Sequence, residues 1–163
     1  MDYRTICDSP LGRLTLSCRD GALTGLWLED QRYFGAGVQD WTWDDAQPLW
    51  PAVRSWLWDY FAGRRPDPQA LPLLLRGTAF QQRVWQQLLT IPYGETVSYG
   101  ALARQLHSSP RAVGGAVGHN PISIVVPCHR VVGSGGALTG YAGGLERKKW
   151  LLRHEREDLT RQQ

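Results

Sequence analysis

The sequence predicts an α/β protein in which a small N-terminal domain of a β-sheet and one helix precedes a mostly helical C-terminal domain. Three observations support this class. Short strand-like segments fill the first 28 residues, apolar residues at helical spacing recur from residue 48 onward, and one short β-branched run interrupts the later helices. At 163 residues the chain can hold one full core or two small domains.

The N-terminal sheet is expected to begin with three strands joined by tight turns. Asp20-Gly21 is a dipeptide typical of hairpins, and the turn before it spans Asp8–Gly12. The expected strands cover residues 3–7, 13–18 and 22–28. Residues 31–47 show no clear periodicity and are expected to form a loop.

A tryptophan-rich helix is expected from Pro48 to Phe61, with Gly63 ending it. Its aromatic residues favour core packing against the sheet over a platform on which nucleic-acid bases stack. Two prolines within residues 64–69 indicate a linker, at about 63–76. We therefore expect a scaffold domain over residues 1–75 and a second domain over residues 77–163.

The second domain contains four segments with helical patterns. Thr78, Ser98 and Ser109 are favourable N-cap residues, and Pro110 falls at a first helical position. The expected helices cover residues 78–89, 98–106, 110–118 and 145–157. The second and third are short and closely connected, so they form a helix-turn-helix candidate.

A short active-site strand is expected within Ile122–Val132, where a β-branched run leads to Pro127, Cys128 and His129. Proline lacks a backbone donor, so strand pairing should stop there. Cys128 would then lie just past a strand end, on a rigid turn beside a titratable imidazole. The alternative is a buried structural thiol, because free cysteine is among the most buried residue types.

Charge and cysteine content restrict the possible partners. Residues 1–75 hold 7 Lys/Arg against 10 Asp/Glu, whereas residues 76–163 hold 11 against 5. The basic half carries Cys128, which suggests a polyanionic partner, although an ordinary solvated surface remains possible. Three cysteines without framework spacing fit a reducing cytoplasm, and no stretch predicts a membrane span or a secretory signal. Cys7 and Cys18 have no nearby histidine, so no metal is expected.

The motifs around Cys128 resemble one protein family. Pro127-Cys128-His129-Arg130 follows Arg111-Ala-Val-Gly-Gly-Ala-Val-Gly118-His-Asn120-Pro121 and precedes Leu138-Thr-Gly-Tyr141-Ala-Gly-Gly144. In this order the segment resembles the O6-alkylguanine–DNA alkyltransferases, which repair alkylated guanine by moving the alkyl group onto a cysteine. The resemblance is dense from Gly77 to Glu155 and much looser before it.

The resemblance implies a catalytic relay. Cys128 would accept the alkyl group, His129 would act as its base through water, and Glu155 would orient His129 and favour its charged form. Asn120 would tie the helix pair to the active-site turn. Taken alone, Glu155 would be interpreted as a solvated charge on the last helix. The product would be a thioether, so one turnover per molecule is implied, with no cofactor or metal.

The resemblance also implies a partner, which is double-stranded DNA containing alkylated bases. The substrates would be O6-alkylguanine and also O4-alkylthymine, turned out of the stack from the minor-groove side by Tyr99 and by Arg111, the intercalating residue. The remaining implied DNA contacts are Ala112, Gly114, Gly115 and Arg130, and the implied substrate pocket is Val131, Tyr141, Ala142 and Gly143. A monomer is expected in solution, with cooperative assembly on DNA left open.

Some features remain open from the residues alone. Three glycines in one helix could serve close packing in the core instead of approach to DNA. The connection from Leu106 to Arg111 is about two residues shorter than usual in the family, and Ala142 stands where a serine is common. His107, His119 and His154 are expected at the surface. The alternatives to alkyl transfer are a lesion-binding protein without catalysis and a cysteine hydrolase using Cys128 and His129.

Overall fold

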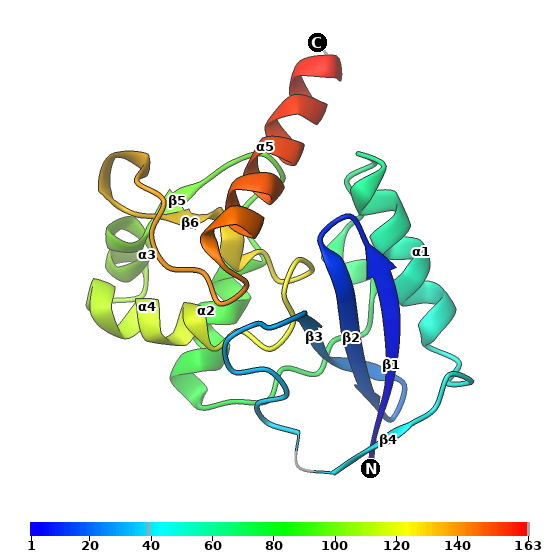
Figure 1. Ribbon diagram of the computed structural model, residues 1–163. Coiled ribbons are helices and arrows are strands. Elements are labelled where there is room, and N and C mark those ends of the chain that lie inside the picture. Colours follow the sequence, from blue (N-terminus) through cyan, green and yellow to red (C-terminus); the bar gives the residue numbers. More distant parts are fainter. Residues whose placement is uncertain (39, 163) are drawn as a thin grey trace.

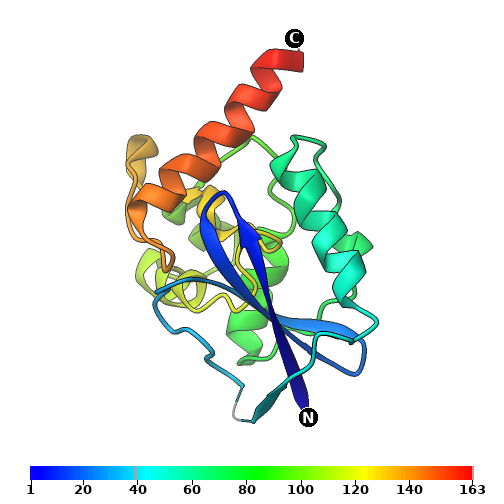
Figure 2. The same cartoon turned by 45° about the vertical axis from the view of Figure 1, so that its right-hand side comes forward.

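The computed structural model describes residues 1–38 and 40–162, with side chains described through residue 157. A β-sheet and helix α1 lie on one side, and three further helices lie on the other (Figure 1). Helix α5 stands between them in this view, and its C-terminal end projects beyond the rest of the molecule (Figure 2). The helices are α1 (Trp50–Phe61), α2 (Ala79–Leu88), α3 (Tyr99–Gln105), α4 (Pro110–Gly118) and α5 (Leu145–Gln162). The expected α/β class is confirmed.

The N-terminal sheet has the strand order β3-β2-β1-β4. Its strands are β1 (Asp2–Ser9), β2 (Gly12–Arg19), β3 (Ala22–Leu28) and β4 (Trp41–Trp43). The first three pair antiparallel as a meander, and β4 runs parallel to β1. Asp20 and Gly21 both have positive φ, 50° and 76°, as a tight hairpin turn requires.

The three expected strands are confirmed, but the loop expected over residues 31–47 was wrong at β4. Trp41 and Trp43 lie on the same side of this short strand, and the Arg4 guanidinium lies 4.5 and 4.2 Å from their ring centroids. This cation–π contact gives the segment a reason to pair with β1 that its lack of periodicity did not reveal. Gln39 lies outside the described residues.

Helix α1 begins two residues later than expected and packs into the core of the sheet domain. Its buried residues join the apolar cluster that contains β2 and β3; they are Trp50, Val53, Trp56, Leu57 and Tyr60. The core interpretation of its tryptophans is therefore confirmed for Trp50 and Trp56, whereas Trp58 is exposed.

The C-terminal helices begin at the caps that the sequence indicated. The Thr78 hydroxyl accepts a hydrogen bond from the Gln81 amide at 3.1 Å, and the Gln81 side chain accepts one from the Thr78 amide at 3.0 Å. Helices α3 and α4 have single-bond caps, in which the Ser98 and Ser109 hydroxyls accept from the backbone amides three residues later. Helices α3 and α4 contact one another across the short connection, and α4 also packs on α2.

Strand β3 connects the sheet to the rest of the chain through hydrogen bonds on its outer edge. The Leu23 amide donates to Pro72 at 2.8 Å, so the chain between the sheet and α2 lies along this strand. The Leu26 amide donates to the Pro121 carbonyl at 2.9 Å, and Leu26 accepts from the Ser123 amide at 3.0 Å. The sheet thereby holds the segment that precedes Cys128. The division into two domains stays a prediction.

Two kinds of feature are absent from the described residues, 1–38 and 40–162. No group of three or more His, Cys, Asp or Glu side chains is arranged there to hold a metal ion. None of the helices in that part of the chain has the length and apolar character needed to cross a bilayer.

Candidate active site

Residues 121–130 form a compact series of turns, so the strand expected before Pro127 was wrong. Ile124 has a φ of 72°, which breaks an extended conformation, and the Val126 amide donates to the Ile122 carbonyl at 3.0 Å. The residues are buried, as expected for an apolar run, but they pair with β3 only at Ile122. The true strand, β6 (Val131–Val132), follows the cysteine and pairs parallel with β5 (Val97–Ser98).

Cys128 starts a 3-10 turn, η2 (Cys128–Arg130), instead of following a strand. Its residue is only 4% exposed, yet it lines a pocket of about 460 Å³. Burial raises the pKa of the Cys128 thiol to about 11, and the nearby Asn120 amide and Lys148 ammonium oppose this only in part. At neutral pH the sulfur is therefore a thiol that needs a base before it can act as a nucleophile.

Asn120 fixes the turn from within. Its side-chain amide donates to the Val126 carbonyl at 2.8 Å, and its side-chain oxygen accepts from the Ile122 amide at 3.0 Å. Both contacts are buried. The residue at the end of α4 thus holds the backbone immediately before Pro127.

His129 points its two ring nitrogens into different environments. Nε2 lies 2.6 Å from Oε2 of Glu155, whereas Nδ1 is buried and has no hydrogen-bond partner within the described part of the chain. Burial lowers the pKa of His129 despite the Glu155 charge. Glu155 does raise the pKa of His129, as expected, but burial outweighs it. His129 is therefore neutral at neutral pH, with Nε2–H donated to Glu155 and Nδ1 free to accept a proton.

Glu155 is a buried carboxylate surrounded by donors, which contradicts its interpretation as a solvated charge. It accepts hydrogen bonds from His129, from the Tyr60 hydroxyl at 2.6 Å, from the Gly94 amide at 2.9 Å and from Arg130 Nε at 2.9 Å. Burial alone would raise its pKa, but His129 and Arg130 hold the pKa of Glu155 well below its usual value. The carboxylate therefore stays ionised.

Arg130 belongs to this cluster and not to the surface, so its expected contact with DNA is corrected. The residue is 6% exposed, and its guanidinium donates to both Glu155 oxygens and to the Ile91 carbonyl at 2.7 Å. These bonds account for all three of its nitrogens. Because the guanidinium is buried and bonded through every nitrogen, it is not at the surface where DNA would bind.

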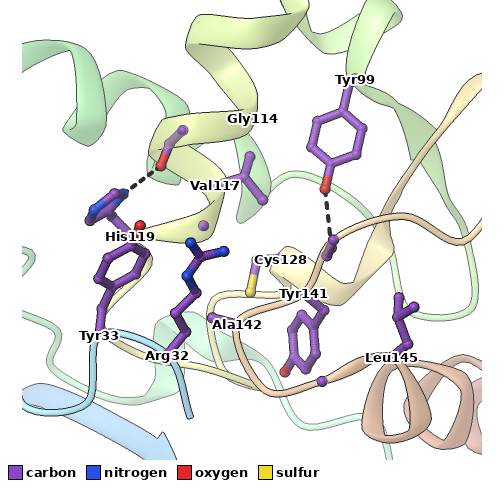
Figure 3. Close-up of a pocket in the computed structure, with 14 residues that line it drawn as sticks. Arg32, Tyr33, Tyr99, Gly114, Val117, His119, Cys128, Tyr141, Ala142 and Leu145 are labelled. Atoms are coloured by element: carbon purple, nitrogen blue, oxygen red, sulfur yellow. Dashed lines mark hydrogen bonds between the residues drawn. The ribbon is translucent and has the colours of Figure 1, made fainter.

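Two of the four expected pocket residues, Tyr141 and Ala142, lie in the pocket wall with Cys128, as Figure 3 shows, whereas Gly143 and Val131 do not line it. Tyr141 and Ala142 line the cavity from the loop before α5, and Tyr99 lines it from the start of α3. The Tyr99 hydroxyl donates to the Gly140 carbonyl at 3.4 Å. Gly143 is needed there because a Cβ would collide with Leu28 and Tyr141. Val131 is fully buried behind the pocket and does not line it.

Lys148 is a residue of this site that the sequence interpretation missed. It is fully buried, and its ammonium donates to the carbonyls of Val131 at 2.6 Å, Thr139 at 2.8 Å and Gly140 at 3.3 Å. Burial lowers its pKa to about 8. A signal was available, because Lys148 shares one face of α5 with Leu151, Leu152 and Glu155 at helical spacing.

Helix α4 forms the opposite wall of the pocket with its glycine-rich face. Gly114, Gly115 and Gly118 line the cavity. A Cβ at Gly115 or Gly118 would meet open space, and one at Gly114 would meet Tyr99 only at 3.9 Å. Close core packing therefore does not explain these glycines. Arg111 and Ala112 are exposed on the first turn of the same helix.

The N-terminal part of the chain contributes a wall that the sequence did not predict. Arg32 and Tyr33, from the loop after β3, line the cavity together with His119. Tyr33 and His119 stack with ring centroids 3.9 Å apart. Of the other two histidines expected at the surface, His107 is exposed, whereas His154 is half-buried and stacks on Trp150.

Comparisons with known proteins cover nearly the whole chain. Residues 2–75 match the family model of the 6-O-methylguanine DNA methyltransferase ribonuclease-like domain, and residues 79–157 match that of the DNA binding domain. A methylated-DNA–protein-cysteine methyltransferase of Mycolicibacterium paratuberculosis is 52% identical over 96% of this chain and 93% of its own length. One of Haemophilus influenzae is 43% identical, over 94% and 86%.

Solved structures give the same result. The Mycobacterium tuberculosis protein OGT in complex with DNA superposes with a TM-score of 0.86 at 49% identity, covering 96% of this chain and 94% of that one. An O6-methylguanine-DNA methyltransferase of Pyrococcus kodakaraensis superposes with a TM-score of 0.69 at 28% identity, covering 95% and 99%.

Proposed function

Because the chain belongs to the 6-O-methylguanine DNA methyltransferase family, whose members repair DNA by moving a methyl group onto a protein cysteine, we propose that Cys128 is the accepting cysteine. The observation that carries the proposal is its position in the wall of a pocket that Tyr99, Tyr141 and α4 also line. Neither Cys7 nor Cys18 lines that pocket. Burial and the charges of Asp2 and Asp44 raise the pKa of Cys18 to about 11.

The base for the Cys128 thiol is His129, acting through one water molecule. Its unpartnered and unprotonated Nδ1 supports this role, because a buried nitrogen without a partner has a vacant acceptor site. Glu155 fixes the tautomer by accepting a hydrogen bond from Nε2–H. Asn120 and Lys148 are positioning residues that hold the turn and the pocket loop.

In the proposed step the thiol proton of Cys128 passes through water to Nδ1 of His129, and the sulfur attacks the alkyl carbon on O6 of guanine. The S–C bond forms as the C–O6 bond breaks, and the electron pair remains on the guanine. Burial and the neighbouring Cys128 raise the pKa of Tyr99, which therefore stays a phenol and can donate a proton to the guanine. The proton on His129 later replaces the one that Tyr99 gave.

The reaction is a single turnover. A thioether lacks the carbonyl at which water hydrolyses a thioester, so the alkyl group stays on Cys128. No second thiol among Cys7 and Cys18 lines the pocket to take it over. Each molecule therefore repairs one base.

The alkylated base must leave the duplex stack to reach the largely buried sulfur. The open, side-chain-free face at Gly115 and Gly118 supports close approach of α4 to the minor groove, and the exposed Arg111 is assigned to the vacated space in the stack. We extend the proposed substrates to O4-alkylthymine, which carries its alkyl oxygen at the corresponding pairing edge. Competition between the two lesions in one duplex measures that preference.

The test is the intact mass of the protein after mixing with a duplex that contains O6-methylguanine. The native chain should gain one methyl group and no more, and fragment masses should assign it to Cys128. Cys128→Ala should gain nothing while still binding the duplex, whereas Cys7→Ala and Cys18→Ala, the matched controls, should react as the native chain does. A methyl group on Cys7 or Cys18 in the Cys128→Ala variant would refute the assignment.

The same experiment separates the alternative functions. A lesion-binding protein without catalysis would hold the duplex and keep its mass. A cysteine hydrolase would release product from an ester or amide over many turnovers.

Within the relay, His129→Gln and Glu155→Gln should each slow transfer strongly, and the double variant should be little slower than the more damaging single one. Independent, multiplicative losses would argue against a relay.

A further inference from the structure

The loop after β3 brings the N-terminal sheet domain to the mouth of the pocket. It follows Leu28 and lies beside the C-terminal end of α4 in both views (Figures 1 and 2). The Arg32 amide donates to the Ala142 carbonyl at 2.9 Å, so this loop is hydrogen-bonded to the pocket loop before α5. Asp30 and Tyr33 both have a φ of 59°, an uncommon conformation that turns the chain sharply on either side of Arg32.

The Tyr33 ring fixes the loop against helix α4. It stacks on the His119 ring with an angle of 20° between the planes. The His119 ring is in turn held by Nδ1, which lies 2.7 Å from the Gly115 carbonyl and donates to it. These contacts join the loop to the same helix whose glycine face lines the pocket.

Arg32 presents an unpaired cation at this position. Its residue is exposed, and no acidic side chain within the described residues forms an ion pair with its guanidinium. The guanidinium contacts the Tyr33 ring, at 5.4 Å from the centroid. Figure 3 shows it projecting between Tyr33 and Cys128 toward α4.

We propose that Arg32 binds a backbone phosphate of the lesion strand beside the alkylated nucleotide, and that the Tyr33–His119 stack holds Arg32 in place for this contact. The inference rests on the proposed function, because it takes the occupant of the pocket to be a nucleotide of DNA. When the base enters the pocket, its sugar and phosphates remain at the mouth, where Arg32 lies. A planar guanidinium fork matches a phosphate, and the free positive charge complements it.

The test measures the binding of lesion duplexes in a Cys128→Ala background, so that the lesion persists. Each phosphate around the lesion is replaced in turn by a neutral methylphosphonate. With Arg32 present, one position should weaken binding roughly tenfold at low salt, as expected for a charge-assisted contact. The Arg32→Gln variant should bind the unmodified lesion duplex more weakly by a similar factor. Replacing the phosphate at that one position by methylphosphonate should then cause no further loss. The salt slope should fall by about 0.9.

The matched control is Arg19→Gln, which removes the same charge from the last residue of β2, opposite Ala22 at the start of β3 and away from the loop. It should keep the sensitivity at every phosphate position. An Arg32→Gln variant that keeps the full methylphosphonate profile of its parent would overturn the proposal. So would a loss of equal size on every modified duplex, because that result would make Arg32 a contact to the base or a support of the fold.

The stack is tested separately. His119→Ala should reproduce part of the Arg32→Gln loss, and His119→Phe, which keeps a ring against Tyr33, should restore binding and the phosphate profile. Failure of His119→Phe to restore them would refute the positioning role. Methyl transfer by the native chain is followed by mass in parallel, so failure of the proposed function is visible independently of the phosphate profile.

Discussion

Glu155→Gln is expected to destabilise the fold as well as slow the reaction, because the carboxylate neutralises a buried arginine. The Glu155 and Arg130 side chains are 1% and 8% exposed and lie 2.9 Å apart, so solvent screens their interaction little. Glutamine keeps the shape but turns an acceptor into an amide donor that faces Arg130, His129 or Gly94. Removing one partner of a buried ion pair typically costs about 3–5 kcal/mol in the free energy of unfolding.

That loss is a large part of a typical stability of about 5–15 kcal/mol. For a chain of this size each kcal/mol corresponds to about 2–4 °C, so the melting temperature should fall by roughly 6–20 °C. Denaturant titration followed by circular dichroism measures the free energy, and a thermal scan measures the shift. Glu146→Gln, on the same helix but 91% exposed, is the control and should change stability by less than about 0.5 kcal/mol.

A double-mutant cycle tests the cause. Arg130→Met removes the cation that Glu155→Gln leaves unpaired, so the double variant should be clearly more stable than the sum of the two single losses implies. A Glu155→Gln loss as small as that of Glu146→Gln, or strictly additive losses in the cycle, would refute the reasoning that Arg130 makes Glu155 essential to the fold.

Three further predictions follow from local geometry. Gly115→Ala should raise stability by up to about 1 kcal/mol, because its Cβ meets open space in a helix, yet weaken binding of lesion duplexes; equal or tighter binding would contradict a DNA-facing role. Thr78→Ala removes the hydroxyl that accepts from the Gln81 amide at the N-terminus of α2 and should cost about 1 kcal/mol by denaturant titration, against almost nothing for Thr96→Ala at an exposed loop position before β5. Single-turnover transfer should be constant near neutral pH and fall as acid protonates His129, with an apparent pKa below about 6.5; the lowered pKa also means that the unfolded chain binds this proton more readily, so stability falls as the pH drops below about 6.5. A rate that instead rises tenfold per pH unit through neutrality would show that Cys128 ionises without His129.

Local signals predicted the helices and the first three strands because those elements depend on neighbouring residues. Thr78, Ser98 and Ser109 cap their helices by contacts within three positions, which spacing alone reveals. The β-branched run before Pro127 misled for the same reason. Its composition favours a strand, but the left-handed Ile124 and the Asn120 side chain impose turns that propensity does not report.

The unpredicted parts of the site depend on contacts distant in sequence. Arg130 stands beside Cys128 and His129, but only the fold places it against Glu155 and away from solvent. Arg32 lines the pocket although it is far in sequence from Tyr99 and Cys128, and nothing in its own segment indicates this position. Lys148 is the intermediate case, because its place on the buried face of α5 could be inferred from periodicity, but the carbonyls that it binds could not.

The edge of β3 has a consequence for how the protein is made. Through Leu26, β3 makes two backbone hydrogen bonds to the residues on either side of Ile122, nearly one hundred residues later in the chain. During synthesis the meander β1–β3 emerges first and can fold while the reactive turn is still being translated. The nascent sheet then acts as a template on which the turn settles when it leaves the ribosome. A chain begun at residue 77 would lack this template. The backbone before its cysteine would then lose the two hydrogen bonds to Leu26.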